Sequence, residues 1–157
     1  MKSYRLLLLL PALYMLSSCN GTANNSQKPA IDITGTWQLI SDTIITKGVK
    51  AVTDYTKNQR MIKIINDTHF AFLKHNTQKD SALKFDAGGG MYTLVGDKYT
   101  ERLDFYNDKN WEHKTFNFTV SVKDDTLLQK GLEKVEKEGI DRVIIEKYIK
   151  VKTEPNN

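Results

Sequence analysis

Alternation of apolar and polar residues with a period of two is the feature that most constrains how this 157-residue chain can fold. The clearest case is segment 115–122, in which phenylalanine or valine occupies every second position. Such alternation is typical of a β-strand with one buried and one solvated face, and no sustained helical period competes with it. From Ile33 onward the sequence therefore predicts an all-β domain.

Turn signals divide this domain into about eight strands joined mostly by short connections. The predicted strands span 34–43, 60–66, 68–74, 83–95, 99–106, 115–122, 126–132 and 142–152. We expect residues 44–58 to form a long loop. The glycines at 88–90 predict a bulge or sharp bend inside a strand, and no motif typical of a phosphate-binding loop follows them. The charged segment 133–138 predicts a hairpin arm, with a helical turn as the alternative.

Short connections make sequential strands antiparallel neighbours, and closing such a sheet on itself removes its exposed edges. The sequence therefore predicts an eight-stranded antiparallel up-and-down β-barrel, whose interior can hold one small ligand. A β-sandwich is the alternative fold. It is disfavoured because Greek-key connections would require more long crossovers than the sequence provides.

Residues 1–18 have the parts of a signal peptide. Lys2 and Arg5 supply positive charge, and the apolar run at 6–16 is too short to span a bilayer as a helix. The run ends in Leu16-Ser17-Ser18-Cys19, which resembles a bacterial lipobox. We expect cleavage before Cys19 and acylation of its thiol. The alternative is an ordinary secretory signal with an incidental cysteine.

Cys19 is the only cysteine, so it has no disulfide partner, and acylation would remove a reactive thiol from an oxidising compartment. Residues 19–32 then form the lipidated cysteine and a polar, flexible tether, 33–152 the barrel and 153–157 a tail. No acidic cluster and no aspartate follow Cys19 directly. These absences favour an outer-membrane lipoprotein on the periplasmic side rather than the cell surface.

Charge and motif content exclude several classes of function. The formal charge of +4 falls by two, to +2, when Lys2 and Arg5 leave, and no basic stripe remains, so nucleic acid is not an expected partner. No catalytic motif of a metalloprotease or hydrolase appears, so we expect no enzyme and no cofactor. The three histidines, at 69, 75 and 113, are spaced as surface or turn residues, and no metal site is predicted. We expect a monomer.

Gly35-Thr36-Trp37 resembles the Gly-x-Trp signature that opens lipocalins. That resemblance implies that Trp37 closes the base of the barrel beneath a basic residue of the last strand, here Lys150 in place of the usual arginine. Together with Gly-Gly-Gly-Met-Tyr-Thr at 88–93, Tyr-Thr-Glu at 99–101 and the closing strand, the chain resembles lipocalin-like domains of unknown function in Bacteroidetes lipoproteins. The resemblance covers about 33–152, and no helix follows the last strand.

Glu101 is the most informative polar residue, because its alternation places it inside the barrel, where a carboxylate requires a partner. It is a candidate to orient a ligand, and a structural ion-pair partner is the alternative. The remaining candidate ligand-binding residues are Tyr99, Tyr92, Leu103, Phe116 and Phe118. Trp111 lies near a hairpin end, either as a contact surface or as an aromatic that covers a loop.

These features predict a membrane-anchored barrel that binds a small, partly apolar ligand, with the loop at 44–58 as a lid. The alternative is a solid barrel that docks on an envelope protein or glycan through Trp111 and the glycines at 88–90. An enzyme that uses Glu101 with another inward acid is the third hypothesis.

Overall fold

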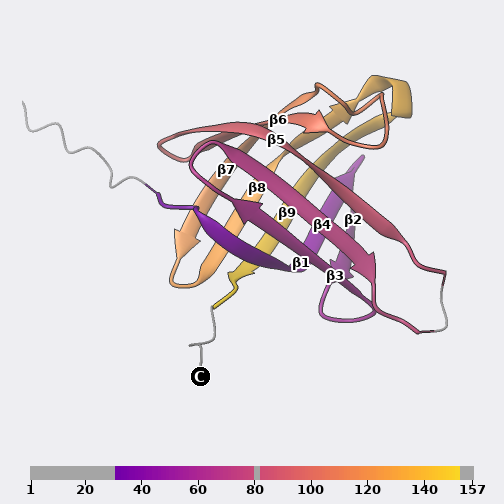
Figure 1. Ribbon diagram of the computed structural model, residues 1–157. Coiled ribbons are helices and arrows are strands. Elements are labelled where there is room, and N and C mark those ends of the chain that lie inside the picture. The colour runs from indigo at the N-terminus through magenta and orange to yellow at the C-terminus, as the bar shows by residue number, and fades with distance from the viewer. Residues whose placement is uncertain (1–30, 80–81, 153–157) are drawn as a thin grey trace, which may run out of the picture.

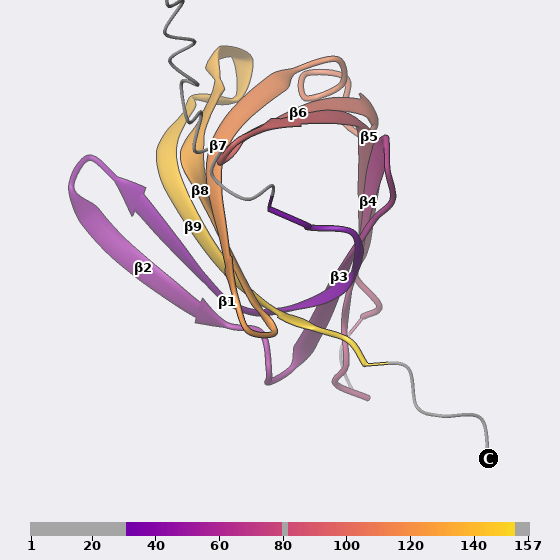
Figure 2. The same ribbon diagram turned by 90° about the vertical axis from the view of Figure 1, so that its left-hand side faces the viewer.

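A computed structural model describes residues 31–79 and 82–152 of the chain. Its nine strands form one antiparallel sheet in the order β2-β1-β3-β4-β5-β6-β7-β8-β9, and pairing of β1 with β9 closes the sheet. The strand bounds are β1 Gly35–Thr46, β2 Val49–Asp54, β3 Gln59–Ile65, β4 His69–Asn76, β5 Phe85–Val95, β6 Lys98–Phe105, β7 Thr115–Lys123, β8 Thr126–Val135 and β9 Ile140–Lys150. Eight strands thus surround the core, and β2 lies outside the ring (Figures 1 and 2). The predicted eight-stranded up-and-down barrel is confirmed.

Burial follows the alternation that predicted the strands. In β7, Phe116, Phe118 and Val120 are buried, and the residues between them are exposed. In β9, Ile144, Glu146 and Tyr148 are buried in the same way, although one of them is a carboxylic acid. The alternation of side chains along these strands therefore identifies the residues that face the interior, whereas the polarity of a residue does not.

The largest error in the predicted strands concerns residues 44–58. Instead of a loop, β1 continues to Thr46 and turns at Lys47 and Gly48, whose φ angles are +50° and +80°. Positive φ at both central residues is the requirement of the tight turn that best fits two twisted antiparallel strands. β2 then pairs with the second half of β1, while the first half pairs with β3. Figure 2 shows this hairpin projecting from the barrel wall.

The glycines at 88–90 lie within β5, which runs without interruption from Phe85. The register against β6 shifts between Gly89 and Gly90, as the predicted bulge requires. A Cβ atom on Gly90 would lie 1.9 Å from the carbonyl oxygen of Arg102, so only glycine allows this approach. The extra residue reverses the alternation of β6, because Leu103 faces inward while Phe105 is 71% exposed.

Trp37 and Lys150 occupy the positions expected at the closed end of the barrel. Trp37 is 1% exposed and its Nε1 donates a hydrogen bond to the Ile33 carbonyl oxygen at 2.7 Å. The Lys150 Nζ lies 5.3 Å from the centroid of the indole ring. Gly35 has a φ of +125°, and a Cβ there would lie 3.1 Å from the Lys150 Cε. Gly35, Trp37 and Lys150 thus lie together as expected, and their role in closing the barrel stays a prediction.

Other connections agree with the predictions in outline. Residues 133–138 form the end of β8 and the short 3-10 helix η1 (Glu136–Glu138), so the favoured hairpin carries a helical turn at its tip. The predicted signal peptide, Cys19, most of the tether and the tail lie outside the described residues. Within residues 31–79 and 82–152, no helix is long and apolar enough to cross a membrane.

Candidate functional site

A cavity of about 290 Å³ lies inside the barrel, and Trp37 is not among the residues that line it. All eight strands of the ring contribute side chains to its wall, together with the segment that precedes β3 and the segment between β6 and β7. The apolar and aromatic lining residues are Ile44, Tyr55, Met61, Phe70, Phe72, Leu103, Tyr106, Trp111, Phe116, Phe118 and Ile144. The polar lining residues are Asp42, Lys63, Lys74, Asp86, Glu101, Gln129, Glu133, Arg142 and Glu146.

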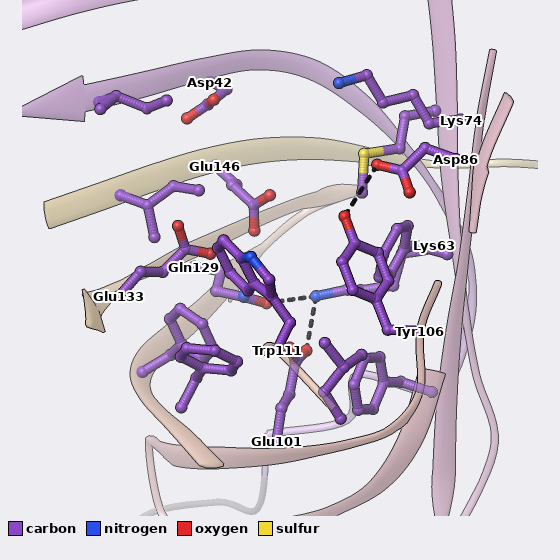
Figure 3. Close-up of a pocket in the computed structure, with 18 of the residues that line it drawn as sticks. Asp42, Lys63, Lys74, Asp86, Glu101, Tyr106, Trp111, Gln129, Glu133 and Glu146 are labelled. Carbon is purple, nitrogen blue, oxygen red and sulfur yellow. Dashed lines mark hydrogen bonds and ion pairs between the residues drawn. The ribbon is translucent and has the colours of Figure 1, made fainter. Parts of the chain in front are cut away.

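Lys63 is buried on one wall of this cavity with Glu101 and Gln129 (Figure 3). Its Nζ donates to the Glu101 Oε1 at 2.6 Å and to the Gln129 Oε1 at 3.0 Å. The aromatic rings of Phe70, Tyr99 and Tyr148 surround the same ammonium group, with centroids 5.5–5.7 Å away. Glu101 thus faces inward as predicted, and its charge is compensated within the protein.

Two further acids lie opposite each other across the β1–β9 pair. Asp42 and Glu146 are cross-strand partners, and Gln129 is the partner of Glu146 on the other side. Side chains in such positions have Cβ atoms about 5 Å apart, and like charges placed there destabilise a sheet. Both acids are more than nine-tenths buried, and the Oδ1 of Asp42 has no hydrogen-bond partner among the described residues.

Burial changes the acidity of this pair. It raises the pKa of Asp42 to about 6, against the opposing effect of the nearby Arg142 guanidinium. It also raises the pKa of Glu146 to about 7; the Lys63 ammonium opposes this shift, and the Glu101 carboxylate adds to it. Desolvation disfavours the ionised form of a carboxylate, and a nearby cation favours it. A cation that enters the cavity would therefore stabilise the ionised forms of Asp42 and Glu146.

Several aromatic side chains and a second ion pair also line the cavity. Trp111 packs against Tyr106 and Phe116, with ring centroids 6.0 Å and 5.8 Å apart. Trp111 is half-buried, which supports its interpretation as an aromatic that covers a loop. The Arg142 Nη2 lies 2.7 Å from the Glu133 Oε2.

Burial, with the Asp86 carboxylate nearby, raises the pKa of Tyr106 to about 12. The Tyr106 hydroxyl therefore stays protonated near neutral pH. It donates a hydrogen bond to the Asp86 Oδ2 at 3.4 Å (Figure 3).

Three of the predicted ligand-binding residues, Leu103, Phe116 and Phe118, line the cavity together with Glu101. Tyr99 does not line it, because this side chain packs beneath Lys63 and is 1% exposed. Tyr92 does not line it either. Its hydroxyl donates to the Asn66 carbonyl oxygen at 2.7 Å, and its ring centroid lies 5.2 Å from that of Tyr99, with the two rings tilted by 54°. Neither tyrosine is placed to contact a ligand in this cavity.

Sequence reasoning missed Lys63, Asp42 and Glu146. The signal was present, because Lys63 shares its alternation with the buried Met61 and Ile65. Charged residues inside strands are ordinarily assigned to the solvated face, which concealed the signal. The segment 44–58 does not form the loop that was predicted as a lid. Most of it belongs to the β1–β2 hairpin, and only Ile44 and Tyr55 of this segment line the cavity.

The three histidines at 69, 75 and 113 are all exposed. In the part of the chain that the structure describes, no group of three or more histidine, cysteine or acidic side chains could hold a metal ion.

Comparisons with known proteins give a likeness of structure and no match of sequence. No family model and no curated protein matches the chain. The chain is similar to a lipocalin-like protein from Bacteroides uniformis ATCC 8492, which is known from a crystal structure. The two share 19% sequence identity with a TM-score of 0.46, over 75% of this chain and 97% of the other. The strand order of this barrel establishes its fold independently of that likeness.

Proposed function

We propose that this protein is a lipid-anchored barrel that binds one small, partly apolar ligand in its interior. The observation that carries the proposal is the cavity of about 290 Å³, which the side chains of the barrel leave unfilled. Ligand pockets are typically concave and rich in aromatic side chains, with a few polar groups that fix orientation. The wall formed by Phe116, Trp111 and Tyr106 on one side and by buried acids on another has this composition.

The volume limits the ligand to a small molecule. The cavity is many times larger than the roughly 10–15 Å³ that a single water molecule needs, so it can hold a small organic molecule. A single aromatic ring with a short polar arm fits the cavity.

The anchor belongs to the same proposal. The lipobox-like sequence that ends at Cys19 supports acylation of this residue, and the polar tether would hold the barrel beside the membrane. We place the protein on the periplasmic side of the outer membrane, as a monomer. Labelling of the native protein with radioactive palmitate, and loss of that label in Cys19→Ala, would support the anchor. An unlabelled native protein would refute it.

Native mass spectrometry of the full chain, purified from membranes of its own host, tests the binding function. The expected result is an additional mass of one small molecule. Leu103→Trp should abolish this additional mass, because Leu103 is buried against the cavity and an indole would fill it. Leu128→Trp is the matched control, since Leu128 is 43% exposed and does not line the cavity. A bare native protein, or equal adducts in both variants, would refute the proposal.

The competing proposal, a solid barrel that docks on an envelope component through Trp111, has less support. Trp111 packs on Tyr106 and Phe116 instead of presenting its ring to solvent. A pull-down from membranes, compared with Trp111→Ala, distinguishes the two proposals. Loss of a specific partner from the variant would favour docking.

A further inference from the structure

We propose that the cavity selects a small organic cation, a primary amine with an aromatic or short aliphatic body, and that its ammonium group binds between Asp42 and Glu146. This inference rests on the proposed binding function and specifies its ligand class. It is carried by the juxtaposition of two buried carboxylates in a cavity where neither of them forms an ion pair with a described residue.

The charges that line the cavity are unbalanced. Five carboxylates face three cationic side chains. Lys63 is paired with Glu101, and Arg142 is paired with Glu133. The third cation, Lys74, lies with its Nζ 5.5 Å from the centroid of the Tyr55 ring.

Asp42, Asp86 and Glu146 remain without an ion pair among the described residues. Acidic side chains in the cavity therefore outnumber cationic ones, and an anionic ligand would add to the negative charge of the ionised acids. A cationic ligand would reduce it.

Asp42 and Glu146 are placed to bind the ammonium group together, because they are directly opposite on neighbouring strands and both line the cavity. Figure 3 shows both carboxylates above the Lys63 group, on the β1 and β9 side of the pocket. The Asp42 Oδ1 is buried and accepts no hydrogen bond from the described residues. An ammonium group supplies three donors and one positive charge, which would satisfy this oxygen and favour the ionised form of both acids.

The rest of the wall suits the body of such an amine. Ile44 and Ile144 are themselves cross-strand partners next to the acidic pair, and the Phe116 and Trp111 rings lie across the pocket. These groups can cover an aromatic ring or a short aliphatic chain. A metal ion is a poorer fit, because no group of three ligating side chains occurs among the described residues.

Calorimetric titration of the full chain in nonionic-detergent micelles, near neutral pH, tests the inference. The probes are 2-phenylethylamine, 2-phenylethanol and 3-phenylpropanoate, which are similar in size and differ in charge. The amine is expected to bind about tenfold or more tightly than the alcohol, and the carboxylate is expected not to bind.

Glu146→Gln should weaken amine binding about tenfold or more and leave alcohol binding unchanged. The matched control is Glu136→Gln, because the Glu136 side chain is 83% exposed at the tip of the β8–β9 hairpin and lies outside the cavity. This control should bind the amine as the native protein does. Thermal unfolding of both variants verifies that each is folded.

Three other results of the titrations would overturn the inference. If the alcohol or the carboxylate binds as tightly as the amine, and Leu103→Trp abolishes that binding, the cavity function stands and the cation preference is wrong. The preference is equally wrong if Glu146→Gln leaves amine affinity unchanged. If none of the three probes binds, the inference fails, and native mass spectrometry alone then decides the proposed function.

Discussion

Removal of the Lys63 charge is the perturbation whose effect on stability follows most directly from the structure. The Lys63 and Glu101 side chains are 4% and 9% exposed, and their charged atoms are 2.6 Å apart. Removing one partner of such a pair leaves the other charge buried without compensation, at a cost of about 3–5 kcal/mol. Lys63→Met should therefore lose a large part of a typical domain stability of about 5–15 kcal/mol.

The size of the loss reflects the Glu101 carboxylate more than the lost methylene packing, because methionine fills nearly the same volume as lysine. The double variant Lys63→Met/Glu101→Leu removes both charges and should recover most of the lost stability. Gln129 would then keep a side-chain oxygen without its lysine donor, so we expect the recovery to be incomplete.

Urea unfolding followed by tryptophan fluorescence measures these differences in the native protein, the two single variants and the double variant. Lys109→Met is the matched control, since Lys109 pairs with Glu112 at the surface with 84% of its side chain exposed. Its unfolding midpoint should not change. The reasoning is refuted if Lys63→Met costs less than about 1 kcal/mol, or if the double variant is as unstable as the two single losses added together.

Three further predictions concern the cavity, the bulge and the closed end. Burial raises the pKa of Glu146 from 4.5 in the unfolded chain to about 7, so folding favours the protonated form. The contribution of Glu146 to the free energy of unfolding should therefore be greatest below about pH 4.5 and be lost as the pH rises through about 7. Glu146→Gln should remove that decline and exceed the native protein above neutral pH by about 2–3 kcal/mol, as measured by urea unfolding across pH; equal slopes would contradict this reasoning. Gly90→Ala should prevent folding or cost about 3 kcal/mol or more, because its Cβ would clash with the Arg102 carbonyl, and a native-like circular dichroism melt would disprove the bulge geometry. Lys150→Ala should lower stability by about 1 kcal/mol through loss of its contact with Trp37, and an unchanged unfolding midpoint would show that the stacked cation is dispensable.

The parts of the fold that depend on alternation and turns could be predicted from the sequence. The Phe116–Phe118 strand, the bulge at Gly90 and the contact of Lys150 with Trp37 all occur as expected. Each of these features depends on local residue type, or on the one pairing that closes a barrel.

The hairpin formed by β1 and β2 could not be predicted with the same rules, because every residue of β2 is exposed. A strand that buries neither face has no apolar period, and only the turn at Lys47-Gly48 marked it. The inward Asp42 and Glu146 were missed for a related reason. Their alternation placed them inside, but their charge favoured the opposite assignment, and only closure of β1 on β9 brings them together.

The cavity itself lies beyond sequence reasoning. Leu103, Phe116 and Phe118 would face the interior of the barrel whether it is filled or hollow. Whether a cavity remains depends on how the side chains of eight strands pack against one another. The polar wall arises in the same way, since Lys63 and Glu101 are 38 residues apart in the chain.

Electron density inside the barrel of crystals grown from protein purified from its own host tests the central claim most directly. The account predicts a continuous feature the size of a small molecule, with one end between Asp42 and Glu146 and the other against Phe116 and Trp111. An interior closed by its own side chains, with no space between these residues, would contradict it.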